Sequence, residues 1–252
     1  MKKVGLIGIG AIGRYFYEKL LQDGVEVVFV AASRKDAGQP YSHLMINSLQ
    51  ELEAKCQEGV DLVIEAATFE AVKTYAPVVL KYASMVVLSS TALADKLFHQ
   101  KVLQLCWQYR THLFVPHGAL MGFDGILDGW EALTSVTITT TKTPHSLGRE
   151  DKVKTVVYDG PTRKACKLYP RNVNVHAGTA LAGLGFDKTR SVIISDPKAK
   201  GNRHEIEVKG KGFAFKVQAL SDTASKVSSS YTLFSAYGSI QRIMKQEGIV
   251  VI

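Results

Sequence analysis

The stretch VGLIGIGAIG, residues 4–13, decides the fold of the first half of this chain. It opens with a short apolar run, Val4 to Ile9, which is typical of a strand buried on both faces of a parallel sheet. The glycines at positions 8, 10 and 13 then spell G-x-G-x-x-G, and Arg14 to Gln22 predict a helix that ends before Gly24. A strand, this glycine spacing and a helix within a unit of about 30 residues form the context in which the motif binds dinucleotides.

Each glycine of the motif has a separate task in such a turn. Gly8 permits the tight turn, Gly10 allows the backbone to approach a pyrophosphate, and Gly13 lets the helix lie close to the strand. The helix N-terminus adds unpaired N–H groups and the positive end of its dipole. The alternative is a purely structural glycine turn. We expect cofactor contacts from Gly8, Gly10, Ala11, Ile12, Gly13 and, after a later strand, Ala67.

The end of the second predicted strand, Val25 to Val30, indicates which dinucleotide is bound. Sites that prefer NAD usually carry Asp or Glu about 20 residues past the motif, where the carboxylate binds the ribose 2′-hydroxyl. This chain reads FVAASRKD over residues 29–36, with alanines in that place and Ser33 and Arg34 just beyond. A cationic, hydroxyl-bearing loop favours a 2′-phosphate and therefore NADP over NAD. The alternatives are that Asp36 turns inward or that these are solvated loop charges.

Predicted strands and helices alternate through the first 115 residues, which is typical of a Rossmann-type, doubly wound parallel sheet with right-handed crossovers. The further strands are predicted at Asp61–Ala66, Met85–Leu88 and His112–Val115, and the further helices at Ser48–Gln57, Phe69–Tyr82 and Leu93–Tyr109.

The pattern changes after Pro116 to a glycine-rich connection, residues 117–129, and then to Thr-rich segments at 135–143 and 154–160. Alternation and β-branching there predict a smaller α+β lobe with a mostly antiparallel sheet. We expect residues 1–118 to form the dinucleotide-binding domain, completed by a C-terminal helix within 224–252, and residues 119–223 to form a substrate-binding and dimerisation domain. In the second lobe we expect a helix from Pro170 to about Leu184 and strands at Ser191–Ser195, Glu205–Val208 and Phe213–Val217.

The charge, cysteine content and hydropathy of the sequence limit the kinds of ligand and partner that we expect. The 252 residues carry a formal net charge of +8, but no run of Lys and Arg is longer than a pair. A phosphate-bearing cofactor or a dicarboxylate explains this excess better than nucleic acid does, and simple solubility is the alternative. The three cysteines form no C-x-x-C pair, so we expect neither a disulfide framework nor a metal site. No apolar run approaches the roughly 18 residues of a membrane span, and we expect a cytoplasmic protein without a membrane partner.

A hydride-transferring enzyme that acts on a carbonyl or imine needs a proton carrier, and histidine is the usual one. Of seven histidines, His204 ranks first, because strand alternation places it on the apolar face together with Asn202. His117 is second, since it follows the last strand of the first lobe, where ligands of open α/β sheets bind. His176 is a third candidate.

Donors gather around the start of the helix predicted at Pro170. Arg171, Asn172 and Asn174 lie beside its positive dipole end, which is a suitable place for a substrate carboxylate. The alternative is that these side chains only cap the helix and bond the loop.

Four segments together resemble the L-aspartate dehydrogenase family over nearly the whole chain: GIGAIG (8–13), PHGALMGFDGI (116–126), YPRNVNVHAGTALAGLGFDKTR (169–190) and SDP followed by NRHEIEV (195–208). The last two are more specific than the glycine motif. The resemblance implies a Rossmann lobe, an α/β substrate lobe, and oxidation of L-aspartate with NAD or NADP to iminoaspartate. Iminoaspartate hydrolyses to oxaloacetate and ammonia or enters NAD biosynthesis.

By the same resemblance, His204 matches the catalytic histidine, with Asn202 beside it, and Ala119 and Asn174 match positions near the nicotinamide. Arg171, Asn202 and His117 are then expected to hold substrate carboxylates. The chain departs from the family at His117, where serine is common, and in lacking the acidic residue after the second strand. Two other functions stay open: an NADP-dependent reductase of another imine or oxo acid, in the style of dihydrodipicolinate reductase, and a nucleotide-sensing protein without catalysis.

Overall fold

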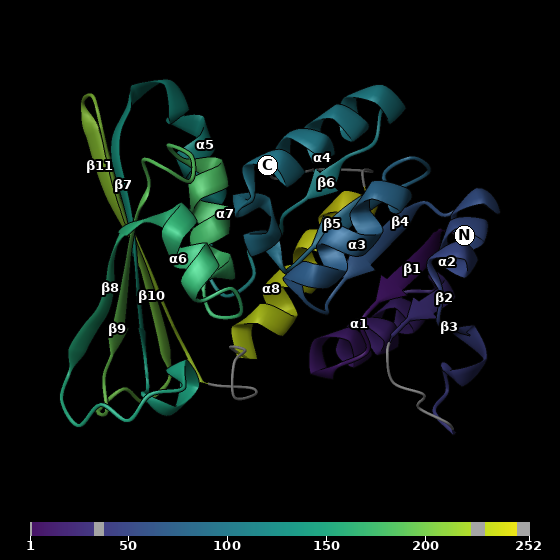
Figure 1. Cartoon of the computed structure of the whole chain (residues 1–252), viewed down its shortest axis with the longest axis horizontal. Helices are drawn as coiled ribbons and strands as arrows, with labels where there is room; N and C mark the ends of the chain where they lie inside the picture. The colour runs from purple at the N-terminus through teal and green to yellow at the C-terminus, as the bar shows by residue number, and fades with distance from the viewer. Residues whose placement is uncertain (1, 33–37, 223–229, 246–252) are drawn as a thin grey trace. The chain divides into compact units, whose positions relative to one another are not determined.

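The computed structural model describes residues 2–32, 38–222 and 230–245 (Figure 1). The chain divides into two compact units, Met1–Val115 and Pro116–Ile252. The predicted domain limits, with a break at residue 118 and residues 224–252 completing the first lobe, stay a prediction. Each unit is described by itself below.

The first unit contains a six-stranded, fully parallel sheet in the order β3-β2-β1-β4-β5-β6. The order reverses between β1 and β4, and ligands of doubly wound sheets bind at the carboxyl ends of the strands at such a switch point. The predicted Rossmann-type sheet is confirmed. Its strands are β1 (Lys3–Ile7), β2 (Glu26–Ala31), β3 (Met45–Ile46), β4 (Leu62–Glu65), β5 (Ser84–Val87) and β6 (Leu113–Phe114).

Side-chain caps set the starts of three of the helices in this unit. Ser48 forms a capping box with Glu51, Thr68 accepts from the N–H of Ala71, and Asp95 accepts from two N–H groups of the next turn. The helix predicted from Leu93 therefore begins later, after a short 3-10 turn, η2 (Ser90–Ala94). The other elements are α1 (Ala11–Gln22), η1 (Ser42–Leu44), α2 (Leu49–Gln57), α3 (Phe69–Val79) and α4 (Lys96–Tyr109).

The second unit contains a five-stranded sheet in the order β11-β10-β7-β9-β8, in which only the β7–β9 pair is parallel. The predicted mostly antiparallel sheet is confirmed. The strands are β7 (Leu133–Lys142), β8 (Thr155–Pro161), β9 (Arg190–Ser195), β10 (Asn202–Gly210) and β11 (Phe213–Ser221).

Helices α5 (Phe123–Asp128), α6 (Thr162–Leu168) and α7 (Asn174–Ala182) lie on one face of this sheet (Figure 1). Side chains that alternate along β7 and β10 pack against α5 and α7 in one apolar core, which includes Phe123, Ile138, Val175 and Ile206. The remaining elements are η3 (Trp130–Ala132), η4 (His145–Leu147) and α8 (Ser230–Met244).

The helix predicted to start at Pro170 begins at Asn174 instead. Residues 170–172 form a turn that is closed by the N–H of Asn172, which donates to the carbonyl oxygen of Tyr169 at 2.9 Å. A separate helix, α6, precedes this turn and was not predicted. Of the closing helix predicted within 224–252, residues 224–229 and 246–252 lie outside the described residues.

Candidate functional site

The turn after β1 has the shape that the glycine motif predicts. Gly8 has φ +92°, and a Cβ there would lie 2.7 Å from the carbonyl oxygen of Ala66. A Cβ on Gly13 would lie 2.2 Å from the carbonyl oxygen of Gly8, whereas a Cβ on Gly10 would meet nothing within 4 Å. Gly8 and Gly13 are thus required by packing, while Gly10 leaves open space at the start of α1. No acidic residue occupies the first turn of α1, so no side-chain carboxylate competes with a bound phosphate there.

A cavity of about 380 Å³ opens at this turn, at the carboxyl ends of β1, β2 and β4. Small residues and backbone surround it, which allows close approach by a ligand's phosphate and sugar groups. Ser33 and Arg34, the predicted contacts of a 2′-phosphate, lie outside the described residues. The lining comprises Ile7, Gly8, Ile9, Gly10, Ala31, Ala32, Ala66, Ala67, Thr68, Ala71 and Tyr75.

A buried carboxylate, Glu65, stabilises the loops beside this cavity. Its Oε1 accepts from the N–H of Ala67 at 2.6 Å and from the hydroxyl of Ser89 at 2.8 Å, and its Oε2 accepts from the N–H of Ser89 at 3.0 Å. Burial raises the pKa of Glu65, and these hydrogen bonds oppose that shift. Glu65 is not among the predicted site residues, although a glutamate at the end of an otherwise apolar strand is a visible signal in the sequence.

In the second unit, His204 lies on the inner face of β10 and is 3% exposed. Its Nδ1 lies 2.8 Å from the hydroxyl oxygen of Thr140, the residue directly opposite on β7. The same hydroxyl lies 2.6 Å from Nε2 of His176, which projects from α7 and is fully buried. The predicted burial of His204 is confirmed, and the first and third candidate histidines share one hydroxyl.

Burial and a neighbouring cation keep both rings neutral. Desolvation, followed by the charge of Lys142, lowers the pKa of His204 to about 3. Desolvation also places the pKa of His176 well below its usual range, with further repulsion from His204 and Lys142. Over the usual working range of pH, the His204 ring is therefore neutral and has one unprotonated nitrogen.

Lys142 is a buried charged residue beside this cluster that is not among the predicted site residues. It is 3% exposed, and its Nζ donates to Oδ1 of Asn172 at 3.2 Å. Burial lowers the pKa of Lys142 to about 8. Strand alternation could have found it, because Val136, Ile138, Thr140 and Lys142 all share the inner face of β7.

Of the other residues predicted to bind substrate, only Asn202 shares the buried face of the sheet with His204. Asn202 is 2% exposed and shares the inner face of β10 with His204, as predicted. Arg171 is exposed in the turn before α7. The ring of His117 packs edge-on against Phe123 at 5.3 Å, and burial lowers its pKa. Within the described residues, no hydrogen bond joins Arg171 or His117 to His204.

The two predicted nicotinamide-side residues also lie in this unit. Asn174 is the first residue of α7, two positions before His176, and Ala119 packs against the apolar core. Each is partly buried. Their positions leave their predicted roles untested.

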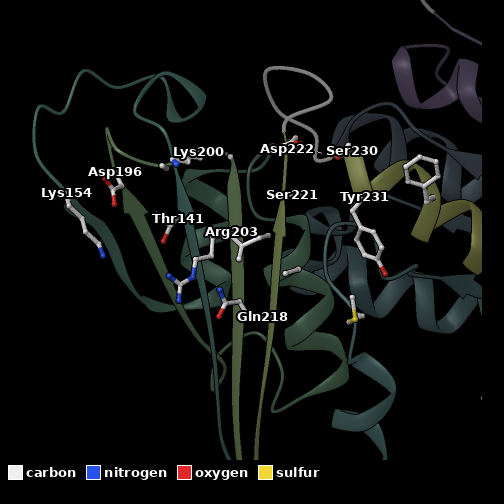
Figure 2. Close-up of a pocket in the computed structure, with 16 residues that line it drawn as sticks. Thr141, Lys154, Asp196, Lys200, Arg203, Gln218, Ser221, Asp222, Ser230 and Tyr231 are labelled. Carbon is white, nitrogen blue, oxygen red and sulfur yellow. Dashed lines mark hydrogen bonds between the residues drawn. The ribbon is translucent and has the colours of Figure 1, made fainter.

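Figure 2 shows a second cavity, of about 720 Å³, bordered by β10, β11 and the start of α8. Thr141, Arg203 and Gln218 line it from the face of the sheet opposite to His204. Ala219 and Ser221, which pair with His204 and Asn202, line it from the His204 face, so the cavity reaches both faces at the edge strand β11. Neither His204 nor Asn202 is among its described lining residues.

The described residues contain neither a cluster of metal-binding side chains nor a membrane-spanning helix. No three His, Cys, Asp or Glu side chains gather there as a metal ion would require. No helix in that part of the chain is long and apolar enough to cross a bilayer.

Comparisons with known proteins agree with this geometry. Residues 128–243 match the family described as "Aspartate dehydrogenase, C-terminal", and residues 8–116 match "Homoserine dehydrogenase, NAD binding domain". The chain is 32% identical to an L-aspartate dehydrogenase of Methanosarcina mazei over 97% of each chain. It is 35% identical to one of Serratia proteamaculans over 86% of this chain and 87% of the relative. The crystal structure of aspartate dehydrogenase from Thermotoga maritima superposes with a TM-score of 0.82 at 27% identity, covering 100% of both chains.

Proposed function

This chain belongs to the L-aspartate dehydrogenase family, and we propose on that premise that it oxidises L-aspartate to iminoaspartate with a nicotinamide dinucleotide. Iminoaspartate then hydrolyses to oxaloacetate and ammonia, and the reverse reaction aminates the oxo acid. The observation that carries the proposal is the near full-length match to curated enzymes of this activity, combined with a buried neutral imidazole at position 204. Iminoaspartate released before hydrolysis would be available to NAD biosynthesis.

The turn after β1 fits the dinucleotide, because Gly8 and Gly13 admit no side chain and Gly10 leaves open space. A bound nicotinamide would supply the hydride acceptor for oxidation at Cα of aspartate. The residues that would hold the cofactor are Gly8, Gly10, Ala11, Ile12, Gly13 and Ala67, with Ala119 and Asn174 near the nicotinamide.

His204 acts on the protons of the reaction. Its neutral ring accepts a proton from the substrate's α-ammonium group, so that the nitrogen lone pair can form the C=N bond as the hydride leaves. In the hydrolytic step it accepts a proton from the water that attacks the imine carbon. Asn202, Arg171 and His117 would bind the two carboxylates, which are also attracted by the buried ammonium group of Lys142.

We propose NADP as the preferred cofactor. Ala31 and Ala32 stand at the end of β2 where an NAD-selective carboxylate would be expected, and both line the cavity. Ser33 and Arg34 follow in the sequence and offer a hydroxyl and a cation to a 2′-phosphate. Comparison of KM for NADPH and NADH tests this choice, and a clear preference for NADH would refute it. Arg34→Asp should move the preference toward NADH.

We further propose a homodimer in the cytoplasm. Helices α5, α6 and α7 lie on one face of the second sheet (Figure 1). Strand register and alternation place Val156 (59% exposed) and Leu220 (72% exposed) on the other face. Cys56, Cys106 and Cys166 are all free thiols, as is usual in a reducing compartment. Light scattering tests the dimer: we expect twice the chain mass, and half that value for Leu220→Asp.

The deciding experiment is a panel of oxo acids incubated with ammonia and NADPH, scored by loss of NADPH absorbance. Turnover with oxaloacetate supports the proposal. Turnover only with another acceptor would favour a reductase of a different imine or oxo acid. Tight binding of NADPH without turnover on any acceptor would favour a nucleotide sensor.

A further inference from the structure

A continuous chain of hydrogen bonds runs through the interior of the second unit and ends at His204. It joins three strands, two helices and a loop, and each link is 2.6 to 2.9 Å long. Every member side chain is at most 3% exposed. In order, the polar groups are the carbonyl oxygen of Thr189, the hydroxyls of Thr162 and Ser191, the ring of His176, the hydroxyl of Thr140 and Nδ1 of His204.

The carbonyl end fixes the direction of the chain. A carbonyl oxygen only accepts, so the hydroxyl of Thr162 donates to Thr189 at 2.9 Å. A hydroxyl has one hydrogen, and Ser191 must therefore donate to Thr162 across the 2.8 Å contact. Ser191 has then used its own hydrogen, so its oxygen accepts from Nδ1–H of His176.

The direction continues through His176 to His204. His176 is fully buried, and no carboxylate contacts it within the described residues, so its ring is neutral with a single N–H. With the hydrogen on Nδ1, its Nε2 accepts from the hydroxyl of Thr140. The Thr140 oxygen then accepts from Nδ1–H of His204, which leaves the lone pair of His204 on Nε2.

We propose that His176 is a positioning residue that, through Thr140, holds His204 in the Nδ1–H tautomer with Nε2 as the proton acceptor. The catalytic meaning of this assignment rests on the proposed function, whereas the tautomer itself does not. The chain also fixes the ring orientation, because a half-turn of the His204 ring would place a C–H group against Thr140. A histidine that enters a reaction as a base needs its lone pair on the outward nitrogen, and the wrong tautomer abolishes that role.

The direct test is 15N NMR of the full-length protein labelled at histidine, without ligand, near neutral pH. The His204 signals are assigned by their loss in His204→Gln. We expect both His204 and His176 to show a protonated Nδ1 and an unprotonated Nε2. An Nε2–H tautomer of His204, or an averaged mixture, would overturn the inference. This result does not depend on turnover, so a correct tautomer in a protein inactive on aspartate would count only against the proposed function.

The variant test uses Thr140. Thr140→Val keeps the shape and removes the hydroxyl, and we expect kcat to fall about tenfold or more while KM for the nucleotide changes less than about threefold. Thr140→Ser restores the hydroxyl and should recover both the Nδ1–H signature and most of kcat. If Thr140→Val does not fold, His176→Asn breaks the same link from the other side. A folded variant of either kind with the wild-type tautomer and wild-type kcat would refute the positioning role.

Discussion

The two units of this molecule build their candidate sites in opposite ways. The turn after β1 is formed from main chain and from residues with little or no side chain, and its function depends on the space that Gly8, Gly10 and Gly13 leave. The site around His204 is formed from polar side chains, each hydrogen-bonded to the next and shielded from water. The first should therefore fail when one carbon is added, and the second when one polar group is removed.

The largest expected effect is on kcat, and it comes from a change at the polar site around His204. His204→Ala should lower kcat by roughly 10²-fold or more, since the variant loses its proton acceptor, while nucleotide affinity stays nearly unchanged. Steady-state kinetics and fluorescence titration with NADPH measure the two quantities. His145→Ala, at an exposed histidine of η4, is the matched control. Near-wild-type turnover of the His204 variant would exclude this residue from catalysis.

Alanine substitutions at Gly10 and Gly13 test the turn after β1. Gly13→Ala places a Cβ 2.2 Å from a backbone oxygen that cannot move aside cheaply, and should lower the free energy of unfolding by roughly 3 kcal/mol. Gly10→Ala makes the same chemical change in open space, so it should unfold like the wild type and yet bind NADPH more weakly. Denaturant titration of the two variants measures the effect on packing, and titration with NADPH measures the effect on nucleotide binding. Equal stability losses in both variants would contradict this division.

The buried ammonium group of Lys142 predicts a pH dependence of stability. Its folded-state pKa, about 8, lies below the ordinary lysine value of 10.5, so between these values the unfolded chain binds more protons than the folded one. The free energy of unfolding should therefore rise as pH increases from 8 to 10.5, by roughly 2 to 3 kcal/mol from this group. Denaturant titrations at several pH values measure it.

Lys142→Met should lose that rise, whereas Lys209→Met, at an exposed position of β10, should keep it. Removal of the Lys142 charge should also raise the pKa of His204, because the ammonium group is one cause of its depression. Identical pH profiles for the wild type and Lys142→Met would show that this ammonium is not desolvated in the folded protein.

The same contrast explains what could be predicted from the sequence. The shape of the turn after β1 was predictable, because its three glycines lie within six residues and each has a local task. The burial of His204 followed from strand alternation alone. Its partners did not, because Thr140 is 64 residues away and joins His204 only through sheet register. The start of α7 was misplaced since the turn at residues 170–172 is stabilised by a backbone hydrogen bond that residue preferences do not encode.

Glu65 is an exception to this contrast, because it is a buried polar side chain in the first unit. Its carboxylate holds two loops together beside the turn that follows β1. In Glu65→Gln the amide oxygen can replace Oε1, but the NH₂ group then faces the N–H of Ser89, so two donors meet. The variant should lose roughly 1 to 2 kcal/mol of stability. Ser89→Ala, which removes only the hydroxyl, should lose less.

The effect of Glu65→Gln should also depend on pH. Burial raises the folded-state pKa of Glu65, so the folded wild type binds more protons than the unfolded chain, and its stability falls as pH rises above the ordinary value of 4.5. The variant lacks this slope, and its deficit should therefore be larger at pH 4 than at pH 7. Thermal unfolding at both pH values, with NADPH binding measured in parallel, tests whether the loops beside the turn after β1 depend on this one carboxylate. A deficit that is constant with pH would mean that Glu65 ionises as it does in the unfolded chain, whereas no deficit at either pH would mean that the backbone alone shapes the turn.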